Sequence, residues 1–135
     1  MKELLNIHEN LREFQSWFEP YVQARVQTLP ENDYGQIKIK KAISHSLLGG
    51  GKRIRAFIIA QSCELYGISK ESIVNLLIAI EMVHCYSLIH DDLPCMDNSD
   101  IRRGKKSLHK EFDEATALLA GNSLMSMAFD AILSN

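Results

Sequence analysis

The segment SIVNLLIAIEMVHCYSLIHDDLP, residues 72–94, constrains the fold more than any other part of the chain. Over Ile73 to Ile80 its apolar residues would lie on nearly every side of a helix, and Pro94 ends the pattern. A helix that is apolar all round lies in the centre of a bundle rather than on its surface. Its longest apolar stretch, 73–83, contains Asn75 and Glu81 and is too short to span a bilayer. We therefore expect an all-α protein built around this segment.

Helical periodicity and chain punctuation predict helices along most of the remaining sequence. Pro20 is expected to end or restart the first helix, and Gly49 to Gly51 to separate the second from the third. No alternating run or hairpin turn indicates a strand. We expect a single all-α domain over residues 1–135. The helices expected in it cover residues 4–18, 36–47, 52–66, 70–93 and 114–133, the last capped by Asp113.

Overall charge and cysteine content exclude several classes of protein. The net charge of −2 implies no general attraction to nucleic acid or to an anionic membrane. The three cysteines, Cys63, Cys85 and Cys95, form no C-x-x-C pair, which disfavours a disulfide framework or a zinc site. The N-terminus lacks the apolar core of a signal peptide. These features predict a cytoplasmic protein without a nucleic-acid partner or stable membrane insertion.

Carboxylates gather where the apolar segment ends. Asp91 and Asp92 close the helix, and Asp97 follows in a loop that can curl back toward them. Converging carboxylates repel unless a cation lies between them, and a helix C-terminus is unfavourable for anions. Hard oxygen ligands suit Mg²⁺, whose coordination is usually completed by water and substrate phosphates. One stripe of the helix leads to this site: Glu81, His84, Leu88 and Asp91.

Two cationic clusters accompany the acidic one. The first is Arg102, Arg103, Lys105 and Lys106, and the second is Lys52, Arg53 and Arg55, directly after the triple glycine. Lys52 and Arg55 share a helix face, whereas Arg53 points elsewhere. Glycines before a cationic helix N-terminus favour an anion site. The three clusters together predict a pocket for diphosphates, some held through metal and some directly.

The stretches GGGKRIR, EMVHCYSLIHDDLPCMDNSDIRRGKKSLH and DEATALLAG resemble the trans-isoprenyl diphosphate synthases, especially the bacterial farnesyl diphosphate synthase (geranyltranstransferase) type. The resemblance covers about residue 47 to the end. It implies an isoprenoid synthase-type helical bundle, usually a homodimer. It also implies a prenyltransferase that condenses isopentenyl diphosphate with dimethylallyl or geranyl diphosphate to give farnesyl diphosphate.

The resemblance also assigns roles to individual residues. Asp91, Asp92 and Asp97 would bind Mg²⁺ and, with Arg102, hold the allylic diphosphate during catalysis. Isopentenyl diphosphate would contact Lys52, Arg55, His84 and Arg103. Tyr86, five residues before the first aspartate, would lie under the growing prenyl tail and limit product length.

Family members are roughly twice this length, as expected of a single large helical domain. Their second aspartate-rich motif has no counterpart here, so the resemblance implies the N-terminal half of a synthase, inactive alone. Other interpretations remain open. The chain would then be a non-catalytic or regulatory subunit retaining only the first motif, or a helical interaction module with a solvated charged loop. A terpene cyclase is disfavoured by GGGKRIR and His84, which suit a second diphosphate substrate.

Overall fold

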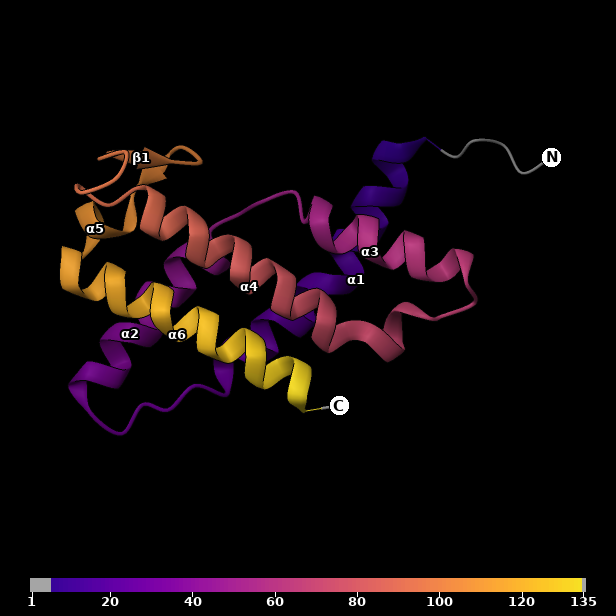
Figure 1. The fold of residues 1–135 in the computed structure, drawn as a ribbon, viewed down its shortest axis with the longest axis horizontal. Coiled ribbons are helices and arrows are strands. Elements are labelled where there is room, and N and C mark those ends of the chain that lie inside the picture. The colour runs from indigo at the N-terminus through magenta and orange to yellow at the C-terminus, as the bar shows by residue number, and fades with distance from the viewer. Residues whose placement is uncertain (1–5, 135) are drawn as a thin grey trace.

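A computed structural model describes residues 6–134 and shows the expected all-α bundle (Figure 1). Leu4 and Leu5, assigned above to the first helix, lie outside the described residues. A two-residue antiparallel hairpin, β1 (Ile101–Arg102) with β2 (Lys105–Lys106), lies within the charged loop. The helices are α1 Ile7–Gln27, α2 Tyr34–Leu47, α3 Ile54–Leu65, α4 Val74–Asp91, α5 Leu108–Glu111 and α6 Glu114–Leu133, with a 3₁₀ helix, η1, at Lys70–Ile73.

Helices α4 and α6 lie side by side in antiparallel orientation and make the most extensive contact between helices of the described residues (Figure 1). Small residues on α6 make this close approach possible. At Gly121 an added Cβ would overlap the ring of His90 on α4, whose Nε2 lies 3.1 Å from the carbonyl oxygen of Leu118. The buried residues of α6 are Thr116, Ala117, Ala120, Gly121, Leu124, Ala128 and Ala131. The expectation that 72–94 supplies a central helix agrees with this packing.

The prediction that Pro20 ends or restarts the first helix is wrong, because α1 continues through it to Gln27. A proline inside a helix removes one hydrogen bond and crowds the preceding turn. Buried residues at four-residue spacing on both sides offset this cost. They are Phe14, Phe18, Val22 and Val26.

Several helix ends follow their sequence signals. Asp113 caps α6 by accepting a hydrogen bond from the Thr116 amide at 2.7 Å, as expected. Gly67 follows α3 with a φ of 75°, which suits a helix C-cap. The third helix, however, begins at Ile54 rather than at residue 52, because Arg53 adopts a left-handed conformation with a φ of 54°. Ser69 caps the short η1 helix, which leads into α4.

Two helical stretches of the described residues, Lys70–Asp91 and Glu114–Leu133, are long and apolar enough to cross a membrane by length and composition alone. The stretch 73–83 is therefore part of a longer helix. The sequence argument that this segment is too short to span a bilayer does not hold for the whole helix. Core helices of water-soluble proteins meet the same criterion. Here the two helices pack against each other, with 39% of each apolar window buried, and two such helices are weak evidence for a membrane segment.

Candidate functional site

The triple glycine opens into a pocket of about 560 Å³, which we call the Gly-loop pocket. It lies between the start of α3, the middle of α4 and the charged hairpin. Gly50 and Gly51 have φ values of 115° and 128°, which side-chain-bearing residues rarely adopt. The lining residues are Gly49, Gly50, Gly51, Lys52, Arg53, Ile54, Arg55, Glu81, His84 and Arg103. The four residues assigned above to isopentenyl diphosphate thus lie around one pocket, although their function stays a prediction.

Cations and His84 are in direct contact in this pocket. Arg55 Nη1 lies 3.2 Å from His84 Nε2. Arg103 Nη1 donates a hydrogen bond to the carbonyl oxygen of Gly50, which joins the hairpin to the glycine loop. Burial and then the charges of Arg55, Arg103 and other arginines lower the pKa of His84. His84 is therefore neutral at pH 7, so one of its ring nitrogens donates a hydrogen bond and the other accepts one.

The N-terminus of α3 adds backbone donors to the same pocket. The N-cap residue Arg53 does not cap this helix with its own side chain, but Glu81 Oε1 on α4 accepts the Ala56 amide at 3.2 Å, so that amide is not among the free donors. The first amides of a helix have no intrahelical acceptor and carry the positive end of the helix dipole. Together with exposed Lys52 and Arg55, they make the Gly-loop pocket suitable for a multiply charged anion such as a diphosphate.

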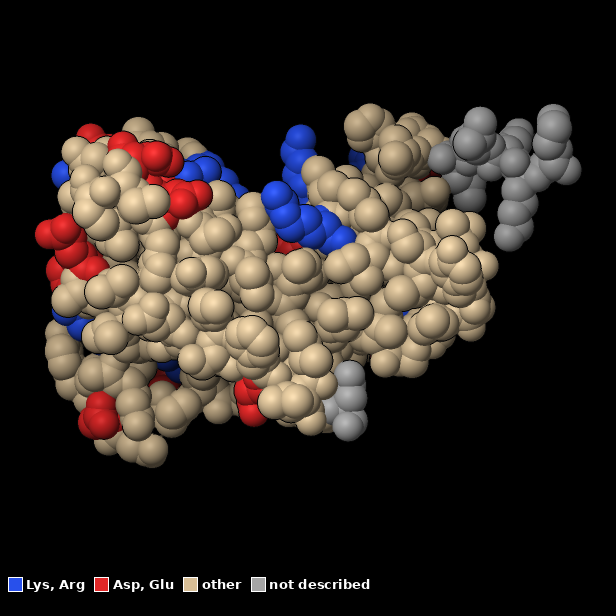
Figure 2. Space-filling view, in the orientation of Figure 1, with Lys and Arg blue, Asp and Glu red and all other residues tan. Residues whose placement is uncertain are grey.

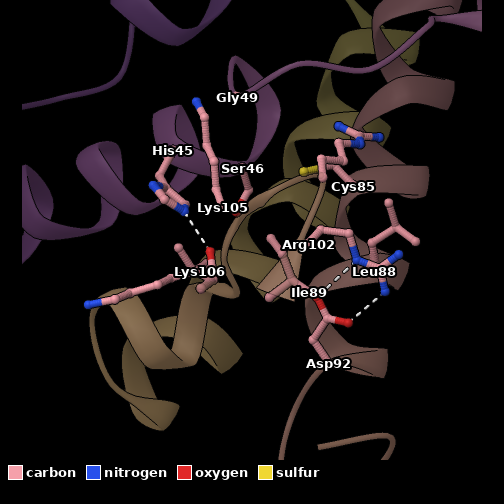
Figure 3. Close-up of a pocket in the computed structure, with 12 residues that line it drawn as sticks. His45, Ser46, Gly49, Cys85, Leu88, Ile89, Asp92, Arg102, Lys105 and Lys106 are labelled. Carbon is pink, nitrogen blue, oxygen red and sulfur yellow. Dashed lines mark hydrogen bonds and ion pairs between the residues drawn. The ribbon is translucent and has the colours of Figure 1, made fainter. Parts of the chain in front are cut away.

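The three aspartates lie where the sequence places them, at the end of α4. Asp91 is its last residue and Asp92 its C-cap, and the Asp97 amide donates to the Asp91 carbonyl oxygen at 2.8 Å. Asp91 and Asp97 are exposed, whereas Asp92 is 2% exposed. Arg102 holds both Asp92 oxygens, with Nη2 to Oδ1 at 2.6 Å and Nε to Oδ2 at 3.1 Å (Figure 3). Hydrogen bonding to Asp92 raises the pKa of Arg102, so the guanidinium stays protonated.

This geometry differs from the expected convergence of three carboxylates. Within residues 6–134, no three His, Cys, Asp or Glu side chains are close enough to hold a metal ion together. Asp92 is turned toward Arg102 because that contact compensates a nearly buried charge. Asp91 and Asp97 remain as exposed, hard oxygen donors in neighbouring positions, a donor set that fits Mg²⁺ completed by water and phosphate. The assignment of all three aspartates as metal ligands stays a prediction.

Acidic and basic side chains gather in different places on the face shown in Figure 2. Asp and Glu side chains gather at the hairpin end, and Lys and Arg side chains stand on both sides of a hollow next to it. A second, small pocket of about 30 Å³ lies between α2, α4 and the hairpin and is lined by Asp92, Arg102 and Arg103 among others (Figure 3). Arg103 lines both pockets, so it connects the acidic end of α4 with the Gly-loop pocket.

Two other side chains of α4, Cys85 and Tyr86, lie near the site. Burial raises the pKa of the Cys85 thiol to about 12, so it stays protonated and is a poor nucleophile. Tyr86 is half-buried on α4, with its ring 4.7 Å from that of His90. Its assignment as the residue that limits product length is not tested by this packing.

The sequence did not predict the ion pairs that support the site, although it placed Glu81 on the helix stripe that leads to it. Glu19 on α1 and Glu81 on α4 both pair with Arg53, at 2.6 Å and 3.7 Å. Glu81 had a signal, because a charge inside an apolar helix needs a partner. Glu19 had none, since nothing in the sequence of α1 indicates which helix it faces.

The fold and the site define a helical protein of the isoprenoid synthase type, with an acidic helix end beside a glycine-rich anion pocket. Residues 36–135 match the family model described as polyprenyl synthetase. The chain belongs to this family.

Individual relatives agree with this assignment. The chain is 51% identical over 98 residues to a farnesyl diphosphate synthase of Micrococcus luteus, covering 73% of this chain and 34% of that protein. It is 50% identical over 98 residues to the heterodimeric geranylgeranyl pyrophosphate synthase large subunit 1 of Arabidopsis thaliana, covering 73% of this chain and 26% of that protein. The chain thus spans only about a quarter to a third of the length of these curated relatives.

Solved structures show the same fold. A geranyltransferase from Legionella pneumophila superposes with a TM-score of 0.86 at 36% identity, over 93% of this chain and 43% of that one. An FPP/GFPP synthase from Zymomonas mobilis superposes with a TM-score of 0.81 at 38% identity, over 91% of this chain and 45% of that one.

Proposed function

We propose that this chain forms the part of a Mg²⁺-dependent prenyltransferase that binds two diphosphates, and that its full activity is head-to-tail condensation to farnesyl diphosphate. The observation that carries the proposal is the Gly-loop pocket, in which Lys52, Arg55, His84 and Arg103 surround one space of about 560 Å³. Ammonium groups, planar guanidinium groups and helix amides are all suited to binding the oxygens of a diphosphate.

The allylic substrate is assigned to the C-terminal end of α4. Asp91 and Asp97, with Asp92 as a further candidate, would hold Mg²⁺, which supplies charge stabilisation to the departing diphosphate. Arg102 would contact the same diphosphate, and Asp92 orients its guanidinium through two hydrogen bonds. Arg103 would then lie between the two assigned diphosphate sites, which is supported by its place in the lining of both pockets.

These positions account for the reaction expected of the family. The allylic carbon–oxygen bond breaks, and its electron pair leaves with the diphosphate near Arg102. The alkene of isopentenyl diphosphate, held in the Gly-loop pocket, attacks the allylic cation and forms the new carbon–carbon bond. A proton then passes to the released diphosphate. No protein nucleophile is required, in keeping with the protonated thiol of Cys85.

Product length is the finer part of the proposal. Relatives are named both farnesyl and geranylgeranyl diphosphate synthases, so the family alone does not decide it. We assign the limit to Tyr86. In a complete enzyme carrying this segment, Tyr86→Ala should lengthen the product beyond fifteen carbons, measured by mass spectrometry of the prenyl diphosphates. An unchanged product distribution would remove Tyr86 from this role.

The first experiment measures binding and turnover of the 135-residue chain. We expect calorimetry to show binding of inorganic diphosphate, strengthened by Mg²⁺ in the wild type but not in Asp91→Ala. Incubation with isopentenyl and geranyl diphosphates and Mg²⁺ should give no farnesyl diphosphate, because the relatives are much longer. Product that disappears in Asp91→Ala would show that this chain suffices.

The same experiment separates the alternatives. Absence of any diphosphate binding would contradict the proposal and favour a helical interaction module. A non-catalytic subunit is the second candidate, since one relative is named as the large subunit of a heterodimeric synthase. It would bind diphosphate and restore turnover only with a different chain. We otherwise propose a cytoplasmic homodimer without nucleic-acid partners or stable membrane insertion.

A further inference from the structure

One buried cation touches several of the elements that surround the Gly-loop pocket. The side chain of Arg53 is 2% exposed. Its Nε and Nη2 donate to the two carboxylate oxygens of Glu19 on α1, at 2.6 and 3.2 Å. Nη2 also donates to the carbonyl oxygen of Leu47, the last residue of α2, at 2.6 Å. Nη1 lies 3.7 Å from Glu81 Oε2 on α4. The guanidinium therefore joins three helices at the base of the pocket.

The backbone of Arg53 is as unusual as its side chain. Its φ of 54° lies in the left-handed region, which glycine adopts more readily than arginine. With this residue turned inward, its neighbours Lys52 and Arg55 are exposed and line the pocket. Gln15 Nε2 on α1 fixes the same turn by donating to the Lys52 carbonyl oxygen at 2.8 Å. An arginine is suited to this strained position because its side chain makes contacts that glycine lacks.

The electrostatics of the pocket also depend on Arg53. Glu81 is 3% exposed and lines a pocket that we assign to an anion. An uncompensated carboxylate there would repel the ligand and would itself be costly to bury. Arg53 supplies the compensating charge. Glu81 Oε1 is then available to accept the Ala56 amide at 3.2 Å, which fixes the first turn of α3.

Burial acts to lower the pKa of Arg53, but the hydrogen bond and charge of Glu19, with the charge of Glu81, outweigh it and raise the pKa. Arg53 is therefore permanently charged. We propose that Arg53, anchored by Glu19 and Glu81, is a positioning residue that sets the spacing of Lys52, Arg55 and His84 for a diphosphate without touching it. This inference rests on the proposed function of the Gly-loop pocket and adds the residues that shape it.

The test compares three variants of the 135-residue chain. Arg53→Lys keeps the charge but loses the planar fork, and Glu19→Gln loses the charge that anchors it. Arg25→Lys is the matched control, because Arg25 also ties α1 to another helix, through Asp130 at 2.5 Å, away from this pocket. Folding of each variant is checked by circular dichroism. If Arg53→Lys does not fold, the affinity of Glu19→Gln decides the test. Glu19 is 34% exposed, so losing its charge should destabilise the fold less.

The first measurement is the affinity for inorganic diphosphate without Mg²⁺, by calorimetry. We expect binding about tenfold weaker in Arg53→Lys, the lower end of the loss known for residues that orient metal ligands. Binding should weaken less in Glu19→Gln and stay unchanged in Arg25→Lys. Wild-type affinity in both pocket variants would overturn the inference. An equal loss in Arg25→Lys would also overturn it, by showing a general effect on the fold.

The second measurement needs no ligand, so it separates this inference from the proposed function. The pKa of His84 is followed by NMR, because Arg55 and the other nearby arginines contribute to lowering it. If Arg53 positions Arg55 against His84, Arg53→Lys moves this pKa back toward its ordinary value and Arg25→Lys does not. An unmoved pKa overturns the inference. A wild-type chain that binds no diphosphate instead refutes the proposed function, and the titration still decides the role of Arg53.

Discussion

Asp91 and Asp92 are adjacent in sequence and have opposite environments. Asp91 is exposed at the last turn of α4, while Asp92 is nearly buried and holds Arg102 with both oxygens. One carboxylate is therefore available to a ligand, and the other maintains the conformation of the loop that carries the arginines.

Asp92→Asn should lower the free energy of unfolding by about 1–3 kcal/mol. The amide retains one acceptor for Arg102, but loses the charge and leaves a nearly buried donor opposite a cation. Chemical denaturation of both proteins measures the difference.

Asp91→Asn is the matched control, since it changes the same group one residue away. It removes an exposed anion from a helix C-terminus and should leave stability unchanged or raise it by up to about 1 kcal/mol. Equal destabilisation by both substitutions would contradict the different roles assigned to them.

The candidate site was partly predictable at the level of residues. The family resemblance named Lys52, Arg55, His84 and Arg103 together, and the structure places them around one pocket. Helical spacing alone predicted only that residues of one segment, such as Lys52 and Arg55, share a helix face. The turn of Asp92 toward Arg102 depends on how the loop folds back, and sequence spacing carries no information on that contact.

Among the elements, the α4–α6 contact depends on one glycine. Gly121→Ala should destabilise the protein by about 1–3 kcal/mol, because the new methyl group overlaps the His90 ring. This effect opposes the gain of about 1 kcal/mol that alanine normally brings inside a helix. Thermal or chemical unfolding measures it.

The second substitution His90→Ala makes the test of Gly121→Ala specific. It should relieve the overlap, so the double variant loses less stability than the two single losses added together. Ser126→Ala, at an exposed position of the same helix, should be neutral or slightly stabilising. Strictly additive losses would mean that the ring and the methyl group do not meet.

The N-terminus of α6 carries a pH-dependent contact. Hydrogen bonds from Lys38 and from Thr116 lower the pKa of Asp113 to about 2. A carboxyl group whose pKa is lowered on folding stabilises the protein above its unfolded pKa of about 4. That contribution is lost as the pH falls from about 4 to 2.

Asp113→Asn keeps a capping oxygen but removes the charge. We expect it to lower the melting temperature at pH 6 and to have a much smaller effect at pH 2. Melting curves of both proteins across this range test the prediction. A difference that is independent of pH would assign the effect to the cap alone.

The helices themselves were largely predictable, and their errors have local causes. Periodicity and caps identified α2, α4 and α6, because each combines an apolar pattern with a terminal signal. Pro20 misled the prediction of α1, since the packing of Phe18 and Val22 outweighs the helix-breaking tendency of proline. The start of α3 was placed two residues early, because the inward turn of Arg53 depends on partners in other helices.

At the scale of the whole molecule, the outer face of α6 is an exposed apolar surface. Four residues form a stripe on this face, at 39–59% exposure: Leu118, Met125, Phe129 and Ile132. Apolar stripes of this kind mark contacts with other protein surfaces. The stripe supports the proposal of self-association.

Sedimentation of the chain should accordingly give a mass above the 15.3 kDa of one copy. Phe129→Ser, in the middle of the stripe, should shift the mass toward that of the monomer. Tyr66→Ser is the control, since Tyr66 is 84% exposed at the end of α3 and its loss should leave the mass unchanged. A monomeric wild-type chain would contradict this prediction.

The contact between His90 and Gly121 also limits how sequences of this fold can diverge. The ring fills the space that any side chain at position 121 would occupy, so neither residue can change freely while the other is kept. Among relatives, a larger residue at position 121 should be accompanied by a smaller one at position 90. An alignment of relatives would then show correlated substitutions at positions 90 and 121, which are far apart in the chain.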